Sequence, residues 1–188
     1  MTFTRAELET FRDATVADLI GAEPPRLLFV GINPGLWTAA TQTHFAHPTN
    51  RFYPALHRAG LTGRELDRVA GLGDQDRAEL LARGIGITNL VARATARASE
   101  LSDEELRDGA ARLVSRIEDW QPRVVAVAGV TAYRTAFGHR RATMGRQDTS
   151  IGSAEVWVVP NPSGLNAHET IDSLADWYRQ VALAAGVL

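Results

Sequence analysis

The sequence contains no cysteine and no lysine, and each absence excludes a class of chemistry. Without cysteine, the chain has no disulfide, thiol nucleophile, thiolate zinc site or cysteine-ligated iron–sulfur cluster. All 20 basic residues are arginine, so no lysine amine is available to form a Schiff base with a substrate. Covalent catalysis through a thiol or a lysine side chain is therefore excluded.

The chain also has little net charge and no long apolar run. A formal net charge of −2 gives no general support for nucleic-acid binding, so any DNA contact has to come from a local arginine-rich face. No apolar run approaches the ~20 residues that span a bilayer, and residues 1–5 lack the pattern of a signal peptide. We expect a cytoplasmic protein with no membrane partner. Its 188 residues, 45% of them hydrophobic, suit one globular domain over 1–188.

Apolar runs of strand length alternate with helical patterns along the chain. The runs that suit buried strands are 26–32, 85–90, 124–128 and 155–160. The segments predicted as helices are 4–20, 51–59, 76–83, 102–120, 131–137 and a final helix from Thr170 onward. Residues 36–51 read as a long polar loop, and residues 139–146 as an arginine-rich loop. This alternation predicts an α/β fold, a three-layer αβα sandwich with a mainly parallel central sheet of about four strands.

Two polar, glycine-containing turns each follow directly on a predicted strand. They are Gly31-Ile32-Asn33-Pro34-Gly35 and Asn161-Pro162-Ser163-Gly164-Leu165. In an open α/β sheet, ligands bind at the carboxyl ends of the strands, so turns from distant parts of the chain can form opposite sides of one pocket. Taken alone, the first turn fits a purely structural strand end equally well. The long polar loop that follows it favours function, because such loops are uncommon without one.

Together the two turns resemble those of the mismatch-specific uracil/thymine-DNA glycosylases, family 2 of the uracil-DNA glycosylase superfamily. The resemblance covers the chain from about residue 26 onward and includes His47-Pro48-x-Asn50-Arg51-Phe52, the segment 86–91 with Arg93-x-Thr95, and Trp120-Gln121-Pro122-Arg123. It implies a monofunctional enzyme that hydrolyses the N-glycosidic bond of a flipped uracil in double-stranded DNA. The G·U mismatch is the foremost substrate, an abasic site is the product, and the reaction initiates base excision repair. It also implies a monomer that needs no cofactor or metal.

The resemblance assigns roles to residues of the first turn and the loop after it. Asn33 matches the asparagine that holds the attacking water, and Phe45 matches the aromatic residue that stacks on the base. Backbone groups of Ile32 and Phe45 are expected to bond the base edge, and Thr38 to border its 5-position. The other expected pocket residues are Gly31, Pro34, Gly35, Asn89 and Asn161. An amide is too weak a base to deprotonate water, so the glycosidic bond is expected to break first.

The second turn is expected to contact the DNA helix. Leu165 matches the wedge that replaces the flipped base in the stack, and the Gly164 backbone matches a contact to the widowed guanine. Ser163, Asn166 and His168 are expected beside them. In the arginine-rich loop, Arg140 and Arg141 are predicted to contact phosphate. The chain departs from the family where Asn166-Ala167-His168 replaces a basic residue common after the leucine, and where Asn89 stands in place of a lysine found in some relatives.

Several alternatives remain open on the sequence alone. Phe45 and Leu165 also fit core positions, an arginine cluster is often only a solvated face, and His44 with His47 forms a metal pair lacking a clear third ligand. At the level of function, one alternative is a noncatalytic module that binds uracil or abasic DNA, which would not need the water-holding Asn33. Another is an α/β hydrolase of free nucleotides or nucleosides, which would not need the Leu165 wedge.

Overall fold

The computed structural model describes residues 2–188, and a five-stranded sheet in the order β2-β1-β3-β5-β4 forms its centre. The strands are β1 (Leu27–Gly31), β2 (Ile85–Asn89), β3 (Val124–Ala128), β4 (Gly145–Ile151) and β5 (Ala154–Val159). β2, β1, β3 and β5 run parallel, and β4 pairs antiparallel with β5 at one edge. The expected α/β sandwich is confirmed, with five strands in place of about four.

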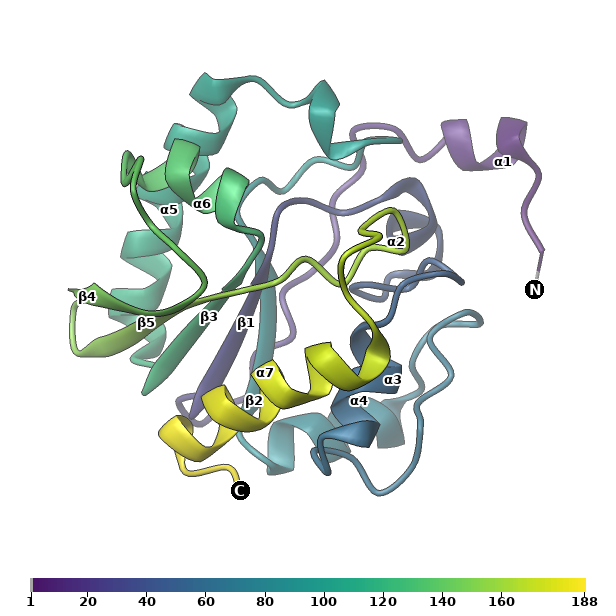
Figure 1. Cartoon of the computed structure of the whole chain (residues 1–188). Coiled ribbons are helices and arrows are strands. Elements are labelled where there is room, and N and C mark those ends of the chain that lie inside the picture. The colour runs from purple at the N-terminus through teal and green to yellow at the C-terminus, as the bar shows by residue number, and fades with distance from the viewer. Residues whose placement is uncertain (1) are drawn as a thin grey trace.

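Helices cover both faces of this sheet (Figure 1). The helices are α1 (Arg5–Glu9), α2 (Leu36–Thr41), α3 (Phe52–Arg58), α4 (Asp74–Ala82), α5 (Asp103–Trp120), α6 (Val130–Phe137) and α7 (Ile171–Ala185), with the 3₁₀ turn η1 (Ala98–Glu100) before α5. Along β1, Leu27 and Phe29 point into the cluster that contains residues of α3 and α7, whereas Leu28 and Val30 point into the cluster under α5 and α6. Both faces of β1 are therefore buried, as its continuous apolar sequence requires.

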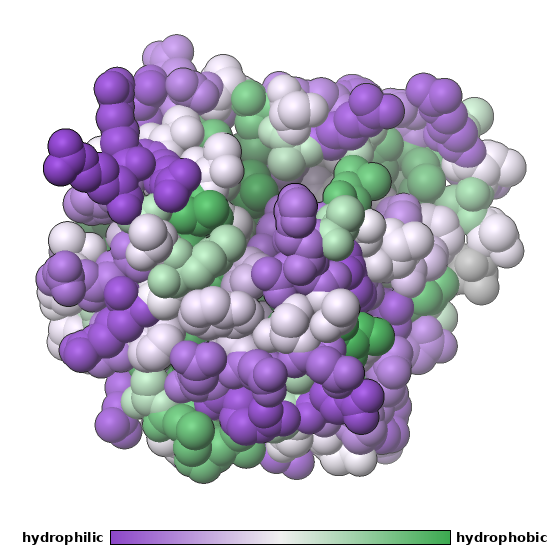
Figure 2. Space-filling view, viewed as in Figure 1, coloured by the Kyte–Doolittle hydropathy of each residue, from purple (hydrophilic) through white to green (hydrophobic). Residues whose placement is uncertain are grey.

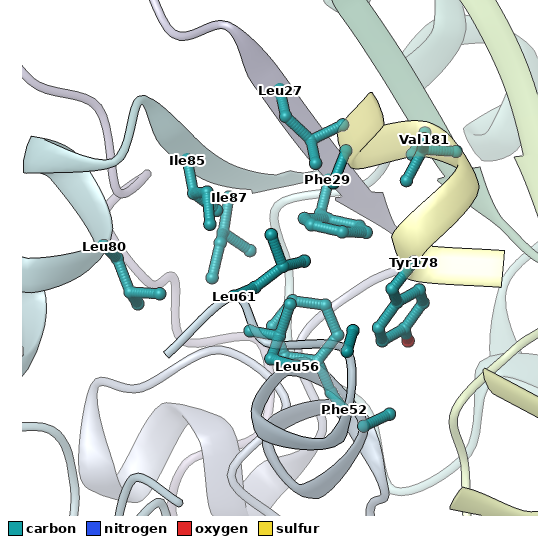
Figure 3. Close-up of a cluster of buried hydrophobic side chains, with 14 of the residues drawn as sticks. Leu27, Phe29, Phe52, Leu56, Leu61, Leu80, Ile85, Ile87, Tyr178 and Val181 are labelled. Carbon is teal, nitrogen blue, oxygen red and sulfur yellow. The ribbon is translucent and has the colours of Figure 1, made fainter. Parts of the chain in front are cut away.

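Phe29 of β1 lies at the centre of the larger core cluster (Figure 3). Its ring contacts Phe52 of α3 edge-on with centroids 5.1 Å apart, and Tyr178 of α7 with centroids 5.0 Å apart. Edge-to-face pairs at this spacing add specific stabilisation to the area they bury. The strand that leads into the first turn is thus anchored to the two helices on this face.

The N-terminal segment differs from the helix predicted over 4–20. α1 ends at Glu9, and Asp13 adopts a left-handed φ of 62°. Leu19 then forms an antiparallel bridge with Ile87 of β2, with both backbone hydrogen bonds present at 2.9 and 3.0 Å. The apolar spacing was only roughly helical, and the bridge at Leu19 bonds backbone groups on the otherwise open edge of β2, which no further strand within residues 2–188 covers.

Two loops expected from the sequence contain regular structure. The long polar loop begins with α2, whose Leu36 and Trp37 are buried, and the arginine-rich loop runs into β4. β4 was missed because most of its residues are polar and at least partly exposed, as an edge strand allows. A two-residue turn with Gly152 at a φ of 57° joins it to β5. Within residues 2–188, no helix combines the length and the apolarity needed to cross a bilayer.

Candidate active site

A cavity of about 260 Å³ lies where the first and second turns meet, at the carboxyl ends of the strands. Every residue of the two turns except Pro162 lines it, together with Thr38, Phe45 and Asn89. The volume is below the ~300–1,000 Å³ usual for drug-sized ligands, so the cavity suits a smaller group such as one base. We call residues 31–35 with Phe45 and Asn89 the first wall, and residues 161–166 the second wall.

The first wall holds the side chain of Asn33 in one orientation. Its Nδ2 donates to the Thr95 hydroxyl at 2.8 Å, the Arg93 carbonyl at 3.0 Å and the Pro34 carbonyl at 3.2 Å. Carbonyls only accept, and the Thr95 hydroxyl already donates to the Arg97 carbonyl at 2.9 Å. The amide nitrogen therefore has to face these groups, and Oδ1 has no protein donor within residues 2–188. That oxygen is left to accept a hydrogen bond from a water or a substrate.

Phe45 is preorganised by its backbone and by the core behind it. It has a left-handed φ of 56°, which is uncommon for a bulky residue and is typical of strained functional positions. Its half-buried ring stacks on Phe52 at 4.2 Å, so the cavity is backed by the aromatic core. The backbone N–H and C=O of Phe45 have no hydrogen-bond partner in the described part of the chain. The residue after Phe45 is held by Thr38, because the Ala46 N–H donates to the Thr38 hydroxyl at 3.4 Å.

Gly31 allows two functional side chains to converge. A Cβ on Gly31 would lie 2.4 Å from Asn89 Oδ1 and 3.1 Å from Cζ of Phe45. Real Cβ atoms essentially never lie within 3.0 Å of another atom, so any side chain at position 31 would displace the Asn89 amide. The Ile32 carbonyl accepts from the Val91 N–H at 2.9 Å, which extends the pairing of β1 and β2 into the site.

A buried histidine orients Asn89. The Ala17 carbonyl lies 3.0 Å from His44 Nε2, so this nitrogen carries the proton, and His44 Nδ1 accepts from Asn89 Nδ2 at 3.1 Å. Burial lowers the pKa of His44, against smaller raising effects of the Ala17 carbonyl and Asp18. Both ring nitrogens are committed, so His44 is not positioned as a metal ligand. In the described residues, no group of three histidines or carboxylates could hold a metal ion.

The side chain of Arg51 holds the second wall in place by binding backbone carbonyls of that loop. The Arg51 guanidinium donates to the carbonyls of Ser163 and Asn166, both at 2.7 Å, and to that of Glu169. The second wall also packs tightly on the loop before α3, since a Cβ on Gly164 would lie 2.3 Å from Thr49 Oγ1. At the tip, the Leu165 side chain is 89% exposed. A large apolar side chain is thus held in solvent beside the cavity mouth.

The side chains of the second wall mostly stabilise the loop itself. Asn161 Oδ1 accepts from the Ser163 N–H at 3.0 Å, and Asn166 Nδ2 donates back to the Asn161 carbonyl at 3.0 Å. The His168 N–H donates to Asn166 Oδ1 at 3.2 Å. Neither Asn166 nor His168 lines the cavity.

The arginine-rich loop lies apart from the cavity. Arg140 and Arg141 line a second, open hollow with Arg146, which shares no residue with the first. Hydrophilic side chains gather at the upper left of Figure 2, over the region of α6 and the loop before β4. Phosphate contact by Arg140 and Arg141 therefore stays a prediction.

The segment after β2 contributes residues that sequence reasoning missed. Residues 95–98 line the cavity, as do His47, Thr49 and Asn50. The segment runs beside the first turn because the Thr95 N–H donates to the Pro34 carbonyl at 3.1 Å. Periodicity carries no signal here, and only the Arg93-x-Thr95 and His47–Asn50 patterns marked these loops in advance.

The chain was also compared with known protein families. A family model described as the uracil DNA glycosylase superfamily matches residues 19–185, which include both turns, all five strands and every helix except α1. On this match and this fold, the chain belongs to the uracil DNA glycosylase superfamily.

Proposed function

We propose that the protein is a monofunctional, mismatch-specific uracil-DNA glycosylase that acts on G·U pairs in duplex DNA. The observation that carries this proposal is the fixed Asn33 amide, whose Oδ1 is available in a cavity suited to one base. In the reaction, the N1–C1′ bond breaks, its electron pair goes to uracil N1, and a water adds to C1′ and loses a proton to solvent. Damaged pyrimidines and G·T pairs are further candidate substrates.

Asn33 is proposed to orient the water without deprotonating it. Held by three acceptors, its amide presents Oδ1 to one water proton and leaves the water lone pair directed toward C1′. No strong base is needed when the glycosidic bond breaks before the water attacks. The unpaired Phe45 N–H is proposed to stabilise the charge that develops on the departing base.

The base is proposed to bind between the Phe45 ring and the Asn89 amide. Phe45 already rests on Phe52, so its ring needs little reordering to stack on the base. The Asn89 amide is oriented by His44, so Oδ1 is positioned to accept from the uracil N3–H, where cytosine has no hydrogen. Uracil is therefore favoured over normal cytosine.

The second wall is proposed to open the duplex and read the opposite base. Leu165 is exposed at the tip and is suited to fill the gap in the base stack. The N–H and C=O of Gly164 have no partner within residues 2–188, so they are available to pair with the edge of a widowed guanine. Since adenine presents a different edge, this contact favours G·U over A·U.

The experiment is excision from labelled duplexes containing G·U, A·U and G·T, and from single-stranded uracil DNA, followed by alkali cleavage of abasic sites. We expect release from G·U above A·U, and a loss of about a hundredfold or more in Asn33→Ala. Equal release from G·U and A·U would refute the mismatch preference. Tight binding of uracil DNA without release from any substrate would make the protein a binding module, and equal activity on deoxyuridine a nucleoside hydrolase.

A further inference from the structure

We propose that Arg97 binds a phosphate of the DNA backbone next to the flipped nucleotide. The inference rests on the proposed function and adds a substrate contact that neither turn supplies. Arg97 lines the cavity and is exposed, and the small side chains of Ala96 and Ala98 flank it. An exposed arginine is therefore part of the cavity lining, with no bulky neighbour on either side in the chain.

The backbone of Arg97 is fixed relative to the water-holding asparagine. Its carbonyl accepts from the Thr95 hydroxyl at 2.9 Å, and that hydroxyl accepts from Asn33 Nδ2 at 2.8 Å. Its N–H donates to Glu100 Oε1 at 2.8 Å, which ties it to the start of η1. Two hydrogen bonds thus connect Arg97 to Asn33, so the guanidinium projects from a defined place in the site.

The charge of Arg97 is uncommitted, unlike that of its neighbours. Arg93 pairs with Glu105 and Asp13, and Arg12 pairs with Glu9 and Glu100. No carboxylate lies within 4.0 Å of the Arg97 guanidinium in the described part of the chain, and Glu100, which accepts from the Arg97 backbone N–H, is already paired with Arg12. Among the arginines at this corner, the one on the cavity rim is available for an external anion.

The order of groups along the cavity identifies that anion as backbone phosphate. In the proposed function the base binds at Phe45 and Asn89 and C1′ lies beside Asn33, so the next groups outward are the sugar and its phosphates. Arg97 is linked to Asn33 through Thr95, and it is exposed whereas Asn33 is half-buried, so it lies on this outward side. A guanidinium matches two phosphate oxygens with parallel hydrogen bonds and retains its charge at any relevant pH. Binding of this phosphate by Arg97 would hold the DNA backbone in place while the base leaves the stack.

The test compares Arg97→Gln and Arg97→Lys with Arg112→Gln, which alters an exposed arginine of α5 outside the cavity. Binding of a duplex with a stable abasic analogue opposite guanine is measured by anisotropy over a salt series. We expect Arg97→Gln to bind about tenfold more weakly at low salt, with a log–log salt slope smaller by about 0.9. Arg97→Lys is expected to restore the slope, and Arg112→Gln to match wild type. Uncharged methylphosphonate linkages are then placed one at a time beside the abasic position.

A neutral linkage at the contacted phosphate is expected to weaken wild type and to leave Arg97→Gln unchanged. An unaltered salt slope in Arg97→Gln, or equal effects of every linkage on both proteins, would overturn the phosphate contact. Excision assays separate the two proposals. A wild type that binds the duplex but releases no uracil would refute the proposed function and leave the Arg97 comparison valid, whereas a wild type that binds no DNA would refute both.

Discussion

The two walls of the cavity are built in opposite ways. On the first wall, side chains face the cavity and the core supports them: Asn33 is held by three acceptors and Phe45 stacks on Phe52. On the second wall, Arg51 grips backbone carbonyls, and the side chain at the tip, Leu165, is left in solvent. The contrast indicates separate tasks, because bond cleavage needs fixed polar atoms, whereas entry into a base stack needs an exposed apolar group on a firm base.

The largest effect is expected from Gly31→Ala, which alters the first wall. Its Cβ would lie 2.4 Å from Asn89 Oδ1 and would force the Asn89 amide or the Phe45 ring away from the base position. We expect uracil excision to fall by about a hundredfold or more, since small displacements of reacting groups have effects of this size. The matched control is Gly73→Ala, where a Cβ would meet nothing within 4 Å. Near-normal excision by a folded Gly31→Ala protein would show that the first wall is adaptable.

Leu165→Ala tests the second wall with a smaller expected effect. Excision from duplex DNA should fall about tenfold, because the wedge offsets an unstacking cost of a few kcal/mol. Excision from single-stranded DNA should change less, because it has no stack to enter. The Leu165 side chain is 89% exposed, so the free energy of unfolding should stay within about 0.5 kcal/mol of wild type. Leu183→Ala, at a 59% exposed position on α7, controls for loss of surface apolar area. Equal losses on both DNA forms would contradict a wedge.

The smallest expected effect concerns His44, which orients Asn89 on the first wall. Burial lowers the pKa of His44 below its ordinary 6.5, so the unfolded chain takes up a proton that the folded chain does not. This contribution to stability is fully present above about pH 6.5 and is lost as the pH falls below it. We expect the advantage of wild type over His44→Gln in unfolding free energy to shrink from about pH 7.5 to 5.5, by at most about 1.4 kcal/mol per pH unit. Denaturant titrations check this, and parallel pH curves would mean that His44 is not held neutral.

The strands and helices of this protein differ in how clearly their own residues mark them. β1, β2, β3 and β5 were predicted because they are short apolar runs bounded by turn residues, and α5 because a capping box precedes a clear apolar face. β4 was not predicted, because an exposed edge strand is defined by the strand it pairs with. The structure of residues 10–20 was not predicted either, because this segment covers the edge of β2 and depends on that contact. The α2 helix was missed for a similar reason, since its buried Leu36 and Trp37 are few and lie beside a glycine and polar residues.

The candidate site shows the same division. The two turns and Phe45 were singled out from the sequence, and the cavity gathers them. The segment 95–98 was missed, because its place beside the first turn depends on hydrogen bonds that continue the β1 and β2 pairing beyond the strands. Arg140 and Arg141 line a separate hollow, and their predicted phosphate contact stays a prediction.

Four of the five strands, most of the longer helices, the exclusion of thiol and lysine chemistry, and the pair of turns that resembles a glycosylase site can all be read from the sequence alone. These depend on local patterns and residue types. The direction of the Asn33 amide, the histidine that orients Asn89 and the arginine at the cavity that has no carboxylate partner within residues 2–188 emerge only from the folded structure. Each of these depends on hydrogen bonds or ion pairs between residues distant in the chain, and such pairings exist only once the sheet has brought them together.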